Sequence, residues 1–106
     1  MPASRLRAYS EAGADALYAP GIRTAEQITA VVKAVAPKPV NVLVSGAGEL
    51  TVQDYAALGV RRLSVGGGLA MVAWNAFAGA AMRLAEGSFD GMMAGRPAVN
   101  MRELFR

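Results

Sequence analysis

Apolar and polar positions along the chain change their period several times, and each change marks the boundary of a predicted element. Between residues 28 and 35, apolar side chains follow the i, i+3, i+4, i+7 spacing of one buried helix face: Ile28, Val31, Val32 and Val35. Residues 40–44 (Val-Asn-Val-Leu-Val) are instead nearly all apolar, which is typical of a strand buried on both faces of a parallel sheet. The pattern therefore predicts a helix followed by an inner strand.

Glycines, prolines and capping residues divide the rest of the chain in the same way. Residues 5–12 are predicted to end a helix at Gly13, and residues 14–19 to form a short strand closed by Pro20 and Gly21. Thr24 begins the next helix, with Gln27 at the capping-box position. Thr51 begins a further helix, with an aspartate three residues later.

The last third of the chain continues the alternation. Residues 61–65 are predicted to be a strand, 66–68 a glycine turn and 69–86 a long helix, with short helical pieces near 89–94 and 100–105. An internal repeat supports this division, because residues 9–21 resemble residues 55–67 in the positions of Tyr, Gly, Leu and Gly. Helix, glycine stop, strand and glycine turn in that order predict a parallel sheet with right-handed crossovers.

The predicted helix at 69–86 is apolar on nearly every side, so we expect it to be buried on more than one face. Charged residues make up only 18% of the chain, a shortage that points to apolar surface covered by another chain. On pattern alone, an open doubly wound sheet and part of a barrel are both possible. The buried helix, and the lack of a strand before the first helix, favour part of a barrel.

Composition excludes several classes of function. The chain has no Cys and no His, so it contains no disulfide, no cysteine nucleophile and no Ser-His-Asp triad. Its net charge of +3 comes from scattered residues, which argues against binding nucleic acid. Residues 63–82 are uncharged, but three successive glycines argue against a membrane helix. The first residues have no apolar signal segment, so we expect a cytoplasmic protein.

Three segments at proper spacing carry a family resemblance: residues 12–22 (AGADALYAPGI), 38–43 (KPVNVL) and 58–66 (LGVRRLSVG). Together they resemble the C-terminal half of the isocitrate lyase/phosphoenolpyruvate mutase superfamily, in particular its phosphonomutase-like and 2-methylisocitrate lyase-like members. The resemblance covers essentially the whole chain. It implies an α/β fold, the C-terminal part of a (β/α)₈ TIM-type barrel from its fifth to its eighth helix, with three to four parallel strands completed by association.

The resemblance also implies an activity and partners. Members use Mg²⁺ and break or rearrange C–C or P–C bonds of small 2-oxo or hydroxy carboxylic acids or phosphonates through an enolate. Their metal-binding carboxylates and mobile catalytic loop lie in the N-terminal half, so this chain is expected to hold no catalytic or metal-binding residue and no cofactor. Members commonly exchange their eighth helix between barrels. We therefore expect one partial-barrel domain over residues 1–106, with residues 69–106 packed on a neighbouring chain of a homo-oligomer.

Two positions depart from the lyase-type members. Pro20 stands where those members carry a Glu, and Leu43 stands where they carry an Asn, although Asn41 lies two residues earlier on the same strand face. A substrate specificity different from that of the lyases, or none, is therefore predicted.

Barrel chemistry gathers where strands end, and this nominates the candidate substrate-binding residues. They are Tyr18, Asn41, Ser45, Glu49, Ser64, Gly66 and Gly67. Each has a plainer interpretation beside the functional one. Asn41 is either a satisfied core amide or a ligand contact, Glu49 an acid–base group or a residue that favours a helix N-terminus, and the glycines a phosphate cradle or a close-packed turn. Arg61 and Arg62 are expected to be a solvated pair.

The residues alone leave three functions possible. The chain is a barrel fragment with no activity of its own, or a partial enzyme that regains a site by associating with a complementary half or a second copy. The alternative is a small α/β module that binds an anion at its glycine turns.

Overall fold

The computed structural model describes residues 2–93 and 99–106. Two compact units make up the chain, Met1–Leu69 and Ala70–Arg106. The first unit contains the sheet, and the second contains most of the long helix. Each unit is described by itself.

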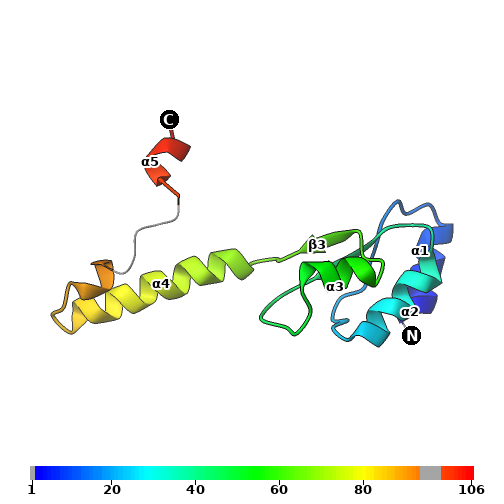
Figure 1. Ribbon diagram of the computed structural model, residues 1–106, viewed down its shortest axis with the longest axis horizontal. Coiled ribbons are helices and arrows are strands. Elements are labelled where there is room, and N and C mark those ends of the chain that lie inside the picture. Colours follow the sequence, from blue (N-terminus) through cyan, green and yellow to red (C-terminus); the bar gives the residue numbers. More distant parts are fainter. Residues whose placement is uncertain (1, 94–98) are drawn as a thin grey trace. The chain divides into compact units, whose positions relative to one another are not determined.

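The first unit alternates helix and strand as the pattern predicts (Figure 1). Its elements are α1 (Pro2–Glu11), β1 (Leu17–Tyr18), α2 (Ala25–Val35), β2 (Val40–Leu43), α3 (Val52–Ala57) and β3 (Arg62–Ser64). Only β1 is much shorter than expected, two residues in place of 14–19. In the described residues it pairs with β2 alone, so the backbone of residues 14–16 has no second strand to bond.

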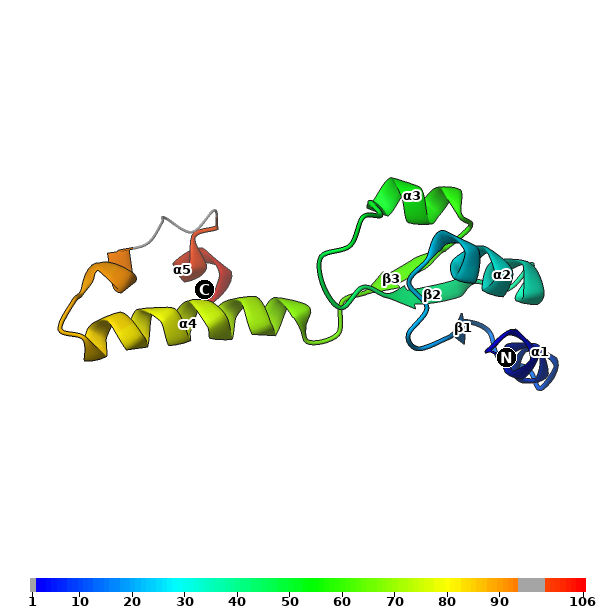
Figure 2. The same ribbon diagram turned by 90° about the horizontal axis from the view of Figure 1, so that it is seen from below.

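The three strands form one parallel sheet in the order β1-β2-β3, and Figure 2 shows them side by side. Tyr18 stands opposite Asn41, and Asn41 stands opposite Arg62. Because side chains alternate across a strand, these three residues share one face of the sheet. Leu43 and Ser64, two residues farther along their strands, are register partners on that same face.

The opposite face of the sheet carries the hydrophobic core. Leu17, Val40 and Val42 are each at most 2% exposed, and they pack with the helices. From α2 come Ile28, Val31 and Val35, three of the four positions predicted for its buried face. Burying one such side chain stabilises a fold by about 1.5–3 kcal/mol. The sheet thus has one face covered by helices and a second, more polar face, which we call the open face. It comprises Tyr18, Asn41, Leu43, Arg62 and Ser64.

The helix starts follow the predicted capping. Thr24 and Gln27 form a capping box at α2, and Thr51 and Asp54 form one at α3. Helices α1 and α2 lie side by side (Figures 1 and 2). The Lys38 ammonium donates to the Ser10 carbonyl at 2.6 Å, so the end of α1 is tied to the segment after α2.

The second unit is helical. Helix α4 (Gly68–Ala85) begins at the end of the first unit and matches the predicted helix at 69–86. A 3₁₀ turn, η1 (Asp90–Met93), and α5 (Met101–Leu104) follow, close to the predicted pieces, although residues 94–98 lie outside the described residues. Arg83 of α4 forms an ion pair with Asp90. Trp74 and Phe77 meet edge to face, with ring centroids 5.8 Å apart.

Helix α4 has no buried residue in this single chain. Its large apolar side chains are all well exposed: Leu69, Met71, Val72, Trp74, Phe77, Met82 and Leu84. A contiguous apolar surface of this kind is uncommon on a monomer. None of the helices in the described part of the chain combines the length and the apolar character that crossing a bilayer needs.

The fold is therefore mixed α/β with a small parallel sheet, consistent with part of a TIM-type barrel. The three strands of the described residues form an open sheet and do not by themselves close a barrel.

Candidate functional site

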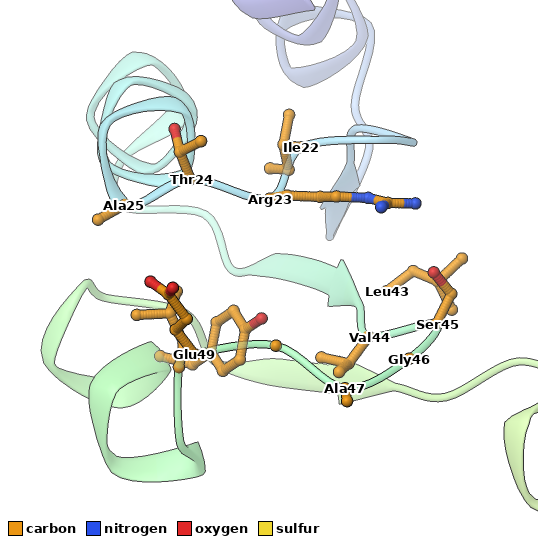
Figure 3. Close-up of a pocket in the computed structure, with 13 residues that line it drawn as sticks. Ile22, Arg23, Thr24, Ala25, Leu43, Val44, Ser45, Gly46, Ala47 and Glu49 are labelled. Carbon is orange, nitrogen blue, oxygen red and sulfur yellow. The ribbon is translucent and has the colours of Figure 1, made fainter.

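Two loops that follow parallel strands enclose a pocket of about 480 Å³ (Figure 3). We call it the loop pocket. One wall is the segment between β1 and α2, and the other is the loop between β2 and α3. Both loops leave the C-terminal ends of their strands, the end at which barrel enzymes place their chemistry.

The first wall contributes a cation that sequence analysis did not nominate. Arg23 lines the pocket, and Figure 3 shows its side chain extending away from Glu49 in that view. The backbone N–H groups of Arg23 and Thr24 donate to Gln27 Oε1, at 2.9 and 3.2 Å. Because the capping box already uses these N–H groups, the Arg23 guanidinium is what this wall offers to an anion. The sequence could have indicated Arg23 as a candidate, because it lies between the end of a predicted strand and the residue that caps the next helix.

The second wall contains two predicted residues, Ser45 and Glu49. Glu49 takes no part in capping α3, because Asp54 performs that role. The Asp54 carboxylate accepts hydrogen bonds from the Thr51 hydroxyl and backbone N–H, both at 2.7 Å, and these bonds lower the pKa of Asp54. A negative charge can favour the N-terminus of α3 without such bonds, so both interpretations of Glu49 stay predictions. The loop pocket thus combines one cation and one carboxylate with the hydroxyl groups of Thr24, Ser45 and Tyr55.

Asn41 is the buried polar residue of the sheet, 8% exposed. Its amide donates from Nδ2 to Ser64 Oγ at 3.0 Å, and its Oδ1 accepts from Arg62 Nη1 at 2.9 Å. These bonds satisfy both polar atoms of the buried amide, as the core-amide interpretation predicts, although the partners are side chains of the neighbouring strand and not backbone groups. With Tyr18, these residues line a shallow hollow of about 430 Å³ on the open face.

Arg62 makes a contact that the sequence analysis did not predict. The pair Arg61 and Arg62 was predicted to be solvated, and both residues are exposed, but Arg62 also donates a hydrogen bond to the buried Asn41 amide. Its position in β3 explains the difference, because Arg62 lies on the open face in register with Asn41. Alternation along the strand, counted from Ser64, was the signal that could have identified it.

The glycine turn after β3 lines neither the loop pocket nor the hollow on the open face. Gly66 has φ +53°, and a Cβ there would meet Leu43 Cδ1 at 3.3 Å. Around Gly67 there is open space, but the N–H of Gly68 already donates to the Val65 carbonyl at 2.9 Å. A close-packed turn accounts for Gly66. Anion binding by Gly66 and Gly67 stays a prediction with no contact to support it.

The described residues contain no cluster of side chains typical of an all-protein metal site. Among residues 2–93 and 99–106, no three acidic, histidine or cysteine side chains gather. Mg²⁺ prefers carboxylate oxygens in octahedral geometry. At the open face, the Asn41 carbonyl oxygen is already taken by a guanidinium, whose positive charge would repel the ion.

One known protein family matches most of the chain. Residues 3–85 match the family described as phosphoenolpyruvate phosphomutase. That match includes the sheet and all of α4. No curated protein is similar enough to be matched.

Solved structures match over almost the whole chain. A protein from Burkholderia cenocepacia J2315, provisionally described as a lyase/mutase, is 47% identical with a TM-score of 0.84, and the match covers 99% of this chain and 37% of that one. An oxaloacetate acetylhydrolase, solved with its product oxalate, is 29% identical with a TM-score of 0.75, covering 98% of this chain and 36% of that one. A 2,3-dimethylmalate lyase shares the fold at 23% identity and a TM-score of 0.74, covering 98% and 36%.

The chain thus spans little more than a third of the length of these structures. Its helices, strands and βα loops nevertheless correspond to one continuous part of the fold, and the family match extends over most of its residues. The chain belongs to the phosphoenolpyruvate phosphomutase family, within the isocitrate lyase/phosphoenolpyruvate mutase superfamily.

Proposed function

We propose that the chain supplies the C-terminal strands and βα loops of a lyase or mutase that cleaves or rearranges C–C or P–C bonds of small 2-oxo or hydroxy carboxylic acids. The observation that carries this proposal is the 47% identity, over 99% of the chain, to a protein provisionally described as a lyase/mutase. The loop pocket adds support, because it lies where such barrels hold their substrates.

The residues of the loop pocket suit an acidic substrate. The Arg23 guanidinium offers paired N–H donors to a carboxylate or phosphonate, and such bonds are stronger than neutral ones. The Ser45 hydroxyl donates a further hydrogen bond. Glu49 excludes a second anionic group from its side of the pocket, so it orients a ligand that has one charged and one neutral end.

The proposed reaction passes through an enolate, which needs electrostatic stabilisation. The described residues do not supply the metal site for that purpose, and we assign no catalytic residue to this chain. Its part in the reaction is to bind and orient the acid. Activity therefore requires the remaining strands of the barrel, and the chain is proposed to be inactive alone.

The test compares the purified chain with the chain coexpressed with the part of the Burkholderia cenocepacia protein that it does not match. Phosphonopyruvate, oxaloacetate and a methylisocitrate-type acid are offered with Mg²⁺, and the formation of phosphoenolpyruvate, pyruvate or oxalate is measured. We expect turnover of one acid by the pair and none by the chain alone. Turnover by the chain alone contradicts the dependence on a complement. A correctly assembled pair that turns over none of the acids contradicts the lyase or mutase function.

Within that pair, Arg23→Met is expected to raise KM at least tenfold, because a charge-assisted contact is worth about 1.5–3 kcal/mol. Arg61→Met is the matched control, since it removes the same charge from a residue outside the pocket. Equal effects of the two substitutions would remove Arg23 from the substrate site.

We also propose that the apolar surface of α4 packs on another copy of the chain, in a cytoplasmic homo-oligomer. The supporting observation is the exposure of its large side chains, with Leu69 at 74% and Phe77 at 65%. Native mass measurement tests this directly. A stable monomer of 11.0 kDa would contradict it.

A further inference from the structure

The open face of the sheet carries a positive charge with no acidic partner. Arg62 makes one hydrogen bond with another side chain, to the neutral Asn41 amide. Within the described part of the chain, the one ion pair joins Arg83 to Asp90. No carboxylate lines the hollow in which Arg62 lies.

The Arg62 side chain is exposed, and a hydrogen bond ties it to the sheet. Asn41 accepts from Arg62 Nη1 at 2.9 Å, and Asn41 is itself fixed by its 3.0 Å bond to Ser64 Oγ. Asn41 is 8% exposed, so this anchor is part of the packed sheet. A guanidinium has five N–H donors, and the remaining donors of Arg62 are presented to the open face in a fixed arrangement.

Arg62 does not line the loop pocket. It is the first residue of β3, and Asn41 is the second residue of β2. The loop pocket is formed by the loops that leave the opposite, C-terminal ends of the strands. The anchored charge is therefore better explained by assembly of the barrel than by the reaction.

Closing a barrel over this face would make it the interior. A guanidinium moved out of water without an opposite charge is strongly destabilising, whereas one that meets a hydrogen-bonded carboxylate is compensated. The segment that completes the barrel must therefore bring an acidic side chain to Arg62. This argument rests on the proposed function, since it assumes that the chain is part of a barrel.

A second copy of the chain does not meet this requirement. Its open face presents Tyr18, Asn41, Leu43, Arg62 and Ser64, among which there is no carboxylate. Two copies closed on each other would enclose two guanidinium groups and no compensating acid. The repulsion between like charges in a low-dielectric interior opposes such an assembly.

We propose that the open face docks a strand segment of different sequence, which presents an Asp or Glu to the Arg62–Asn41–Ser64 cluster on that face. The cluster is a positioning site for that carboxylate, and a second copy of this chain is excluded from the same role. This exclusion does not apply to the proposed association of copies through α4, because α4 contributes no residue to the open face.

Coexpression with the unmatched part of the Burkholderia cenocepacia protein tests the proposal. Native mass measures assembly for the wild-type chain, Arg62→Glu and the matched control Arg61→Glu, which makes the same charge change one residue away. We expect Arg61→Glu to assemble as the wild type does and Arg62→Glu to lose at least tenfold in assembled fraction. A single Asp→Lys or Glu→Lys change on an inner strand face of the partner should restore assembly with Arg62→Glu. Equal assembly of the two arginine variants overturns the proposal.

A measurement on the chain alone covers the case in which no pair assembles. Acetate, as a probe carboxylate, is titrated against chloride while NMR follows the Arg62 Nε–H and Asn41 Nδ2–H signals. A saturable shift with acetate, absent in Arg62→Gln and unchanged in Arg61→Gln, supports the site, and no saturable shift overturns it. An assembled pair that depends on Arg62 but turns over no acid refutes the proposed function alone.

Discussion

Gly59 is the position where a single methyl group should distinguish backbone strain from steric conflict. It follows α3 with φ +89°, and a Cβ built there would lie 2.9 Å from Val32 Cγ1. Gly21 has a similar φ of +82°, with nothing within 4 Å of its Cβ position. The two glycines therefore form a matched pair, because Gly59→Ala and Gly21→Ala have the same backbone cost and differ in the contact.

The expected magnitudes follow from three effects. Alanine in the left-handed region costs about 1–2 kcal/mol. The smaller entropy of the unfolded chain offsets about 0.4–1 kcal/mol of that cost. At Gly59 the β-branched Val32 must also leave its preferred rotamer, which costs a further ~0.5–1.5 kcal/mol. We expect Gly21→Ala to lower the free energy of unfolding by about 1 kcal/mol and Gly59→Ala by about 2 kcal/mol.

Urea unfolding followed by far-UV circular dichroism measures the difference. With an m value of about 1.5 kcal/mol/M, Gly59→Ala should lower the midpoint by about 1.3 M, roughly twice the shift of Gly21→Ala. Val32→Ala removes the conflicting methyl group, so the double variant should recover about 1 kcal/mol relative to the sum of the single changes. Equal losses at Gly59 and Gly21, or strict additivity with Val32→Ala, would refute the steric explanation.

Three further predictions concern a cap, an ion pair and the apolar helix. Thr24→Ala removes the α2 capping box and should cost about 1 kcal/mol in urea unfolding, whereas Thr24→Ser should cost less. Arg83 lowers the pKa of Asp90, so the stabilisation from this pair is complete above the ordinary aspartate pKa and is lost as pH falls through the lowered value. A carbon NMR titration should show the Asp90 midpoint rise in Arg83→Gln, and an unchanged midpoint would contradict the pairing. Trp74 is 63% exposed on α4, so Trp74→Lys should weaken self-association in sedimentation experiments, whereas Trp74→Phe should preserve it. Equal self-association of the two variants would show that Trp74 is not part of the interface.

Much of the fold was readable in the sequence because its signals are local. The spacing of Ile28, Val31 and Val35 predicted the buried face of α2, and Thr24 and Thr51 predicted where two helices begin. Such signals act within one or two turns of a helix, so a single sequence contains them. The family resemblance, carried by three segments at proper spacing, was confirmed by the family match over residues 3–85.

The candidate site was only partly readable, because it depends on which strands are neighbours. Ser45 and Glu49 were nominated by their place after a strand, and they do lie in one pocket, but Arg23 on the opposite wall was missed. Tyr18 and Asn41 were nominated with them and lie instead on the open face. The position of a residue along a strand predicts at which end of the sheet it lies, but the pairing of neighbouring strands decides which other residues it contacts.

The sequence by itself determined the order of helices and strands, the caps and the core face of α2, since all of these arise from contacts between residues near in the chain. Only the tertiary structure decided the role of Arg62. Register between β2 and β3 brings its guanidinium to Asn41, 21 residues away in sequence, so that an exposed arginine is hydrogen-bonded to a buried amide. Alternation along β3 places Arg62 on the same face as Ser64, but the residue opposite it on the neighbouring strand is decided only when the sheet assembles.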